Sequence, residues 1–293
     1  MPASPETTPS ASESPSYWRV LLTFARNSLI RDMTFRTNFL VQAVSSVSWT
    51  LMNLGFYIIV FKHTSMIGPN TGWGREEFFV FLGTTWIVNS IVQAFFMPNA
   101  NEFSELIRTG NLDFALLKPI DTQFLISFTR IEWSSLANLA MGIGLLIHAL
   151  IQLAGDPSDP SVPTVWAVLL YPFYIACGVA ILYGSMISLA ATSVWLGRNQ
   201  SLYDFWFYLT NFYRHPMEIF QRGRFGWSLF VAVLPILVVA NVPARLLARP
   251  LFPEHDPWLW TLAPLTALAA VVALVVSRWV FQRALLSYRS ASS

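Results

Sequence analysis

The sequence predicts an all-α polytopic membrane protein with six transmembrane helices. Hydrophobic residues make up 54% of the chain and charged residues only 12%, which is about half the charged fraction of a typical soluble protein. The apolar residues fall in separate runs of roughly 20 residues or more, the length of helix that crosses about 30 Å of hydrocarbon. The expected spans cover residues 38–61, 78–97, 133–153, 164–195, 225–247 and 259–281.

Two segments precede the first span. Residues 1–16 are rich in Ser, Pro and Thr and contain no Lys or Arg, which predicts a disordered tail rather than a signal peptide. Residues 17–36 place an apolar stripe at helical spacing beside Arg19, Arg26 and Arg31. That pattern favours a helix in the membrane interface, with its arginines toward anionic headgroups, over a simple cytoplasmic extension of the first span.

The fourth and fifth spans are irregular. Residues 164–195 exceed the length of a perpendicular helix, so we expect tilt, a kink near Pro172 or an extension beyond the bilayer. Residues 197–226 mix aromatic rings with arginines, a composition typical of the membrane interface. Pro235 and Pro243 leave open whether the fifth span crosses fully or breaks near its outer end.

Positive charge predicts the orientation. With the N-terminus inside and six spans, fourteen of the 18 Lys and Arg residues lie on the inner side and four on the outer side. The inner residues are Arg19, Arg26, Arg31, Arg36, Arg108, Lys118, Arg130, Arg198, Arg214, Arg222, Arg224, Arg278, Arg283 and Arg289. The outer residues are Lys62, Arg75, Arg245 and Arg249. The positive-inside rule therefore places both termini and residues 98–132 in the cytoplasm, with 286–293 as a cytoplasmic tail.

The cytoplasmic segment 98–132 begins with a predicted amphipathic helix. Asn99 and Glu102 are spaced like a helix cap and its third-position partner. Arg108 in the last turn and Gly110 just beyond it are typical of a helix stop. One apolar face of this helix is formed by Phe103, Leu106 and Ile107.

A second short helix is expected directly afterwards. It starts at Asn111 or Asp113 and runs through Leu117, and Lys118-Pro119 ends it because a residue before proline avoids the helical region. Two amphipathic helices in tandem on the cytoplasmic side predict a docking surface for a soluble partner. The alternative is an interfacial loop that touches only lipid.

The sequence contains no local motif of a catalytic or cofactor site. A phosphate-binding loop needs a Lys preceded by Gly and followed by Ser or Thr, whereas Lys62 precedes His63 and Lys118 precedes Pro119. The histidines are scattered, without metal-ligand spacing. Cys177 is the single cysteine, so no intrachain disulfide can form. We therefore expect a protein that is not an enzyme and holds no cofactor of its own.

Polar residues inside the spans are expected to hold helices together rather than to contact a substrate. They are Gln42, Asn53, Asn89, Gln93, Asn138, His148 and Asn241. Small residues at Gly142, Gly144 and Gly184-Ser185 are expected to permit close helix approach.

Four sequence pieces resemble a known family. They are Gly110-Asn111-Leu112-Asp113 leading to Leu117-Lys118-Pro119, Tyr213 to Pro216 and Phe220, Pro235 with Pro243-Ala244, and Ala284 to Ser290. With these pieces the chain resembles the membrane subunit of a bacterial ABC transporter of the type-2 (ABC-2) permease class, exporter-like in architecture. The resemblance covers nearly all of residues 17–290, but it gives no role to the N-terminal tail.

The resemblance implies a six-span permease domain (37–285) that pairs with an identical or homologous half in the bacterial inner membrane. Separate ATP-binding subunits, which hold ATP and magnesium, would dock on its cytoplasmic face. Residues 17–36 would be the connecting helix, and the segment between spans two and three would contain the coupling helix. The docking residues would be Glu102, Phe103, Leu106, Ile107, Arg108, Gly110, Asn111, Leu112, Asp113, Leu117, Lys118 and Pro119.

Two other functions stay open at this point. A stand-alone secondary carrier or channel would need charged groups at mid-membrane, and the expected spans contain few. A membrane-embedded lipid-modifying enzyme would gather acidic or histidine residues at one interface. Glu254, His255 and Asp256 form such a group, although a solvated turn explains it more simply. The sequence does not identify the transported substrate, nor whether the second half-permease is identical or homologous.

Overall fold

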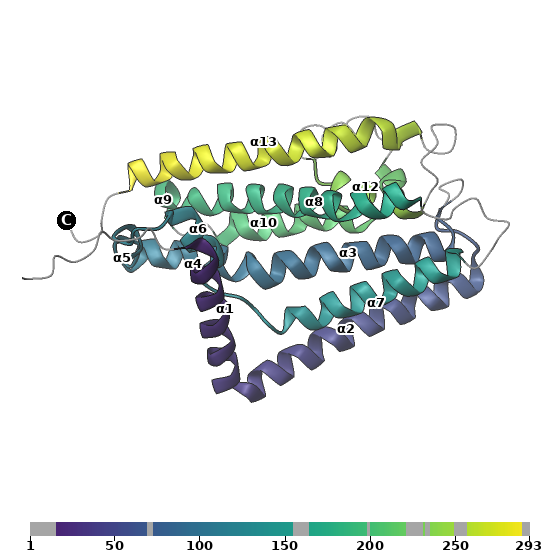
Figure 1. Cartoon of the computed structure of the whole chain (residues 1–293), viewed down its shortest axis with the longest axis horizontal. Coiled ribbons are helices and arrows are strands. Elements are labelled where there is room, and N and C mark those ends of the chain that lie inside the picture. Colours follow the sequence, from purple (N-terminus) through teal and green to yellow (C-terminus); the bar gives the residue numbers. More distant parts are fainter. Residues whose placement is uncertain are drawn as a thin grey trace, which may run out of the picture.

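The structure is a computed structural model that describes residues 16–68, 73–154, 164–197, 200–220, 231, 235–248 and 257–288. Within these ranges every regular element is a helix, and most helices run along one common axis (Figure 1). The predicted all-α class is therefore confirmed for this part of the chain. The tail up to residue 15, the turn at 155–163, residues 221–230 of the fifth-span region, the 254–256 group and the terminal residues 289–293 lie outside the described residues.

Five helices in the described residues are long and apolar enough to cross a membrane. They are α2 (Arg36–His63), α3 (Arg75–Phe95), α7 (Ser135–Ala154), α8 (Val165–Ala191) and α13 (Pro257–Ser287). They correspond to the first, second, third, fourth and sixth predicted spans, because continuous apolar runs fix both their existence and their approximate length. Pro172 lies inside α8, and the helix continues through it.

Helix α3 lies at the centre of the bundle, between α7 and α8 (Figure 1). Its contact with α7 depends on two facing glycines: a Cβ atom at Gly83 would lie 3.0 Å from the carbonyl oxygen of Gly142. Gly184 is equally restricted, because a Cβ there would lie 2.7 Å from the carbonyl oxygen of Ala273 in α13. The expected close approach is confirmed at Gly142 and Gly184. It is wrong at Gly144, where an added Cβ would meet open space.

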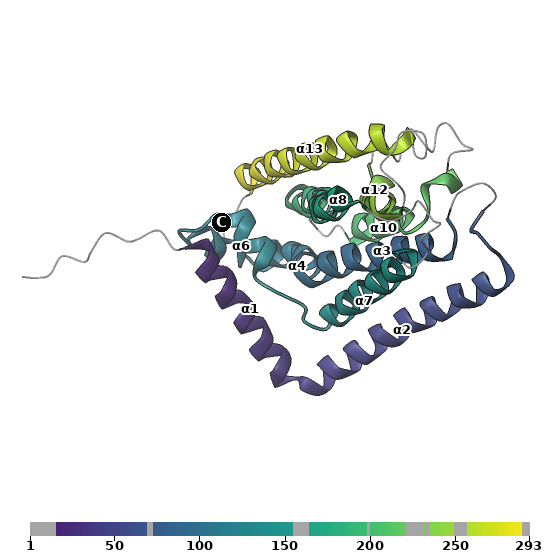
Figure 2. The same ribbon diagram turned by 45° about the vertical axis from the view of Figure 1, so that its right-hand side comes forward.

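Helix α1 (Tyr17–Thr34) turns sharply into α2 at Phe35 and crosses one end of the bundle (Figures 1 and 2). The hydroxyl of Tyr17 accepts from the backbone N–H of Asp121 at 3.4 Å, and its ring packs edge-to-face on Phe124 with centroids 4.9 Å apart. Farther along, Ser28 Oγ accepts from the N–H of Ile131 at 3.1 Å. A helix separate from the first span is thus confirmed, and its position in the membrane interface remains a prediction.

Residues 200–220 run through the bundle, which corrects their assignment to an interfacial stretch. They form α10 (Gln200–Thr210) and two short 3-10 helices, η1 (Asn211–Arg214) and η2 (Met217–Phe220). Tyr203 donates to the carbonyl of Ala100, beyond one end of α3, at 2.7 Å. Glu218 accepts from the indole N–H of Trp73, just before the other end of α3, at 2.9 Å. Because these two contacts lie at opposite ends of α3, residues 200–220 extend along the whole length of that helix.

Helix α12 (Val238–Ala248) is the described regular element within the predicted fifth span. Its 11 residues are too few to cross a bilayer, since crossing needs about 20 residues. All of its residues are buried, and Pro243 lies inside it. Figure 2 shows α12 beside α8 and α10, on the inner side of α13. A predicted fifth span over 225–247 is thus replaced, where the chain is described, by a short buried helix at the Trp73 end of the bundle.

Candidate functional site

Three short helices at the α1 end of the bundle form the segment predicted to dock a partner. They are α4 (Met97–Arg108), α5 (Leu112–Leu116) and α6 (Thr122–Phe128). Gly110 has φ of +71°, a left-handed conformation that favours glycine, so the predicted helix stop is confirmed. The second short helix is confirmed as α5. Helix α6 was missed, although Asp121 is a recognisable cap whose carboxylate accepts from the N–H of Phe124 at 2.9 Å.

The predicted capping role of Asn99 is wrong. The residue lies inside α4, which begins at Met97. Its buried amide donates to the carbonyl oxygens of Ser127 at 3.0 Å and Arg130 at 2.7 Å, and it accepts from the N–H of Arg130 at 2.8 Å. These partners lie about thirty residues away in sequence, so no local spacing could reveal them. Asn99 holds the connection between α6 and α7 against α4.

Two of the predicted docking residues are fully buried and cannot form part of a surface. Phe103 packs against Phe281 of α13, with ring centroids 5.6 Å apart, and Leu112 belongs to the same core. Leu106 and Ile107 are half-buried against that core. The apolar face of α4 therefore attaches the segment to the bundle.

The exposed apolar surface of this segment lies on and after α5. Leu117 is 81% exposed and Phe114 is 68% exposed, and Leu116 is also exposed. Leu117 was among the predicted docking residues, whereas Phe114 and Leu116 were missed. For Phe114 the signal was present in the sequence: once Leu112 is assigned to the core, helical spacing turns position 114 to the opposite side. Leu116 lies four residues after Leu112, on the same side of the helix, so spacing alone does not predict its exposure. Large apolar side chains on such a short helix are typical of a protein contact.

Phe114, Leu116 and Leu117 together form an exposed apolar knob. Other members of the predicted docking set lie next to it in the sequence. Asn111, Lys118 and Pro119 are exposed. Asp113 is half-buried and lies beside Tyr288, just past the end of α13. Burial raises the pKa of the Tyr288 hydroxyl, and the negative charge of Asp113 raises it further. Asp113 is thus placed between the exposed knob and the end of the last helix.

Ion pairs fasten the segment to its neighbours. Glu102 accepts from Arg130 Nε at 2.7 Å, and Asp121 accepts from Arg278 of α13 at 2.5 Å. Burial of Asp121 opposes its charged form. The hydrogen bonds from Arg278 and from the N–H of Phe124 outweigh that effect and lower the pKa of the carboxyl group. Arg108 pairs with the nearby Glu105 at the exposed surface. The segment is therefore a rigid support rather than a loose loop.

A second candidate site is a cavity of about 790 Å³ between α2, α3, α7 and η1. Five of the seven polar residues that the sequence analysis found in the spans line it: Gln42, Asn53, Asn89, Gln93 and Asn138. The remaining two do not, since His148 is exposed on α7 and Asn241 is buried in α12. The cavity wall also contains Trp49, Trp86 and Arg214. The structure thus gathers amides from separate spans around one space.

One of these amides does hold helices together, as expected. Asn138 of α7 accepts from the hydroxyl of Thr50 at 3.2 Å and donates to the hydroxyl of Ser46. Both hydroxyls belong to α2, which otherwise lies obliquely outside α3 and α7 (Figure 2). The packing role is confirmed for Asn138. Ser46, Thr50 and Asn138 all line the cavity.

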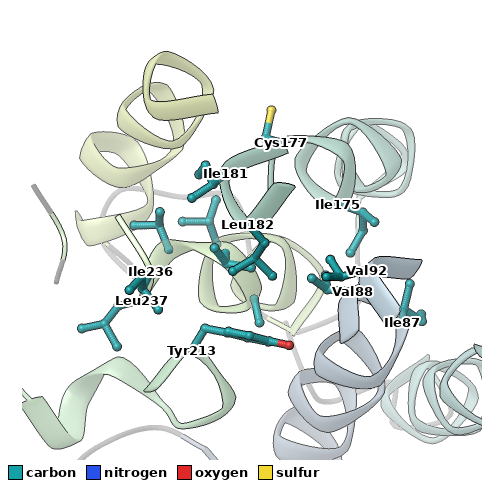
Figure 3. Close-up of a cluster of buried hydrophobic side chains, with 14 of the residues drawn as sticks. Ile87, Val88, Val92, Ile175, Cys177, Ile181, Leu182, Tyr213, Ile236 and Leu237 are labelled. Atoms are coloured by element: carbon teal, nitrogen blue, oxygen red, sulfur yellow. The ribbon is translucent and has the colours of Figure 1, made fainter. Parts of the chain in front are cut away.

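Arg214 brings a positive charge into the cavity wall. Its Nη2 donates to the side-chain oxygen of Asn89 at 2.7 Å, and the hydroxyl of Tyr213 reaches the same oxygen at 3.3 Å. Figure 3 shows the ring of Tyr213 below Leu182, with its hydroxyl turned toward the helix that contains Val88. The sequence predicts that Arg214 is one of the cytoplasmic residues. In the structure it lies beside α3 within the bundle, and its place on the cytoplasmic side stays a prediction.

Helix α12 fixes the position of this arginine. Asn241 accepts from the N–H of Met217 at 2.9 Å and donates to the carbonyl of His215 at 3.1 Å. Arg245, which is almost fully buried, pairs with Glu218. The chain on the C-terminal side of Arg214 is therefore held by an amide and an ion pair from one short helix.

Glu132 is the acidic residue in the cavity wall. It lies in the connection before α7, where its hydroxyl partner is Ser134 at 3.2 Å. Burial raises the pKa of this carboxyl group, and the charge of Asp32 raises it further. Among the described residues, no three His, Cys, Asp or Glu side chains are placed to hold a metal ion.

Comparison with protein families identifies most of the chain. The model of a family described as ABC-2 family transporter protein matches residues 47–292. The match begins inside α2 and includes α4–α6, the residues of the cavity from Trp49 onward, and α13. No curated protein and no solved structure matches the chain.

Proposed function

Because the chain belongs to the ABC-2 family of transporter proteins, we propose that it is the membrane-spanning permease subunit of an ATP-driven exporter. The family is one of transport permeases, and the five long apolar helices agree with a multi-pass membrane protein. A second half-permease, identical or homologous, completes the translocation path. ATP and magnesium bind to separate ATP-binding subunits, and this chain holds no cofactor.

The observation that supports the docking role best is the apolar knob formed by Phe114, Leu116 and Leu117. It stands on a framework that is fixed by buried Asn99, by Phe103 and by the Asp121–Arg278 pair. An exposed leucine is ordinary on a lipid-facing helix. Here it sits on a polar segment at the end of the bundle, where a soluble protein can cover it. We assign the ATPase contact to this knob, and the buried residues Phe103 and Leu112 to its support.

Charge supports a cytoplasmic position for this end of the bundle. With Arg214 removed from the count, and residues outside the described ranges left aside, most of the remaining Lys and Arg residues still lie at the α1 end. They are Arg19, Arg26, Arg31, Arg36, Arg108, Lys118, Arg130, Arg278 and Arg283. Lys62, Arg75 and Arg245 lie at the Trp73 end. On the positive-inside rule we propose that both chain ends face the cytoplasm. The membrane we propose is the bacterial inner membrane.

Coupling between the knob and the cavity would pass along α3. Helices α3 and α4 form one apolar helical stretch, Arg75–Arg108, interrupted only at Phe96. A force on α5 is passed to α6, which it contacts, and α6 is tied to α4 through the hydrogen bond from Asn99 to Ser127. Movement of α4 then moves α3, which contributes Asn89 and Gln93 to the cavity wall. Closure of paired ATP-binding subunits would in this way rock the helices around the cavity.

Cysteine labelling tests the contact and the orientation together. Leu117→Cys and Met66→Cys are made in a Cys177→Ser background, with the exposed Met66 as the matched position at the opposite end. We expect a membrane-impermeant maleimide to label position 117 only from the cytoplasm and position 66 only from outside. Co-expression of the ATP-binding subunit should protect position 117 alone. Labelling of position 117 from outside, or without any protection, would contradict the proposal.

A further inference from the structure

Arg214 is the feature of the cavity that packing does not explain. Its Nη2 donates to a neutral amide, Asn89, and its Nε is buried without a hydrogen-bond partner. Among the described residues no carboxylate forms an ion pair with it. A neutral donor would satisfy Asn89 equally well. The positive charge of Arg214 and its Nε, which donates no hydrogen bond, therefore indicate a ligand that is not part of the chain.

The position of Arg214 makes that charge costly. The residue lies beside Asn89, which is well inside the apolar helix α3. An ionised side chain at such depth is rare and is normally paired or turned into a water-filled space. Arg214 lines the cavity of about 790 Å³. An anion in that space would make charge-assisted hydrogen bonds with the guanidinium group and offset its desolvation.

The rest of the cavity wall suits a molecule that is partly apolar. Trp49 and Trp86 offer aromatic faces, and Gln42 and Asn53 on α2 offer amides that donate and accept hydrogen bonds. The rim on α2 reaches the outside of the bundle, because Trp49 is 67% exposed while it also lines the cavity. The outside of a spanning helix faces lipid or the second permease half. A ligand that enters there must tolerate an apolar environment.

We propose that the cavity binds an anionic amphiphile, with its acidic group on Arg214 and its apolar part against Trp49 and Trp86. This inference rests on the proposed permease function and adds the class of substrate. It favours a carboxylate or phosphate attached to an apolar chain over a cation. The acidic residue in the cavity wall, Glu132, lies in the connection before α7.

Tryptophan quenching by brominated probes tests the inference directly. The full chain is reconstituted in phosphatidylcholine nanodiscs and titrated with three probes of equal length: a bromoalkyl carboxylate, a bromoalkyl alcohol and a bromoalkyl trimethylammonium. The readout needs no ATP-binding subunit, so its failure is distinguishable from failure of the docking role. We expect saturable quenching by the carboxylate, with an affinity about tenfold or more above that for the other two probes.

Variants test whether Arg214 causes the preference for the carboxylate probe. Arg214→Gln should lower the affinity for the carboxylate about tenfold, to that of the alcohol. Arg214→Lys should retain the preference for the anion, which also shows that a change at this position can leave the fold intact. Arg26→Gln removes one positive charge from α1, outside the cavity, and should leave binding unchanged.

Two results would overturn the proposal. Equal affinity for the carboxylate and the alcohol, or full retention of carboxylate binding in Arg214→Gln with an unchanged melting temperature, would show that Arg214 does not select an anion. Complete competition by inorganic phosphate at the same concentration as the carboxylate would assign the site to small free anions and not to an amphiphile.

Discussion

The guanidinium group of Arg214 donates to the side-chain oxygen of Asn89 at 2.7 Å, across the space between η1 and α3. Together with the hydroxyl of Tyr213, which reaches the same oxygen at 3.3 Å, this contact joins the segment predicted at the interface to the central helix of the bundle. Because α3 continues into α4, Asn89 and the exposed knob of α5 lie on one connected support. The relationship makes Asn89 the most informative position at which to alter the cavity.

Asn89→Asp should neutralise Arg214 from within the chain. The new carboxylate would pair with the guanidinium group and compete with any anionic ligand. We expect the melting temperature to stay at or above that of the wild type, and the affinity for the bromoalkyl carboxylate to fall about tenfold. Asn89→Leu is the matched control: it leaves the half-buried charge of Arg214 without this partner, so it should lower the melting temperature. An Asn89→Asp variant that binds the anion normally would contradict the account.

Leu112→Ala and Leu117→Ala should differ in their effect on stability, although both change a leucine in the same short segment. Leu112 is fully buried and Leu117 is 81% exposed. Truncation of a buried leucine costs about 2–5 kcal/mol of unfolding free energy, whereas an exposed change usually stays within about 0.5 kcal/mol. Thermal unfolding of the purified variants measures both. A larger destabilisation by Leu117→Ala would reverse the assignment of support and surface.

Glu218→Gln should destabilise the Trp73 end of the bundle. The variant leaves the buried guanidinium of Arg245 without its carboxylate, and breaking a buried pair in this way costs about 3–5 kcal/mol. Glu105→Gln is the matched control, because its pair with Arg108 is exposed. Exposed pairs contribute about 0–1 kcal/mol. Similar melting temperatures for the two variants would show that the Arg245–Glu218 pair does not hold η2.

Asp121 should make the stability of the α4–α6 segment dependent on pH. Its pKa is lowered in the folded protein, so the folded state binds fewer protons than the unfolded state. The stabilising contribution is therefore present above the unfolded pKa of about 4 and is lost as the pH falls through the lower folded value. Melting temperatures measured between neutral and acidic pH should show this loss. Asp121→Asn should lack this component, and an identical pH profile in that variant would exclude the role.

Apolar run length predicted the first, second, third, fourth and sixth spans, and turn chemistry predicted the helix stop at Gly110. The misassigned residues have partners that no local pattern encodes. Asn99 looks like a cap in sequence, yet its hydrogen bonds reach Ser127 and Arg130. Tyr203 and Arg214 look interfacial, yet they bond to Ala100 and Asn89, more than a hundred residues away. The cavity could not be foreseen for the same reason, because its amides come from three separate spans.

Co-purification of the ATP-binding subunit tests the central claim most directly. The wild-type chain and the variants Leu117→Asp and Met66→Asp, which change exposed side chains at opposite ends of the bundle, are each co-expressed with that subunit. We predict that the wild type and Met66→Asp retain an ATP-hydrolysing subunit with a phosphate-binding loop, and that Leu117→Asp loses it while it still inserts normally. A wild-type chain that purifies without this subunit, or a Leu117→Asp chain that retains it fully, would contradict the account.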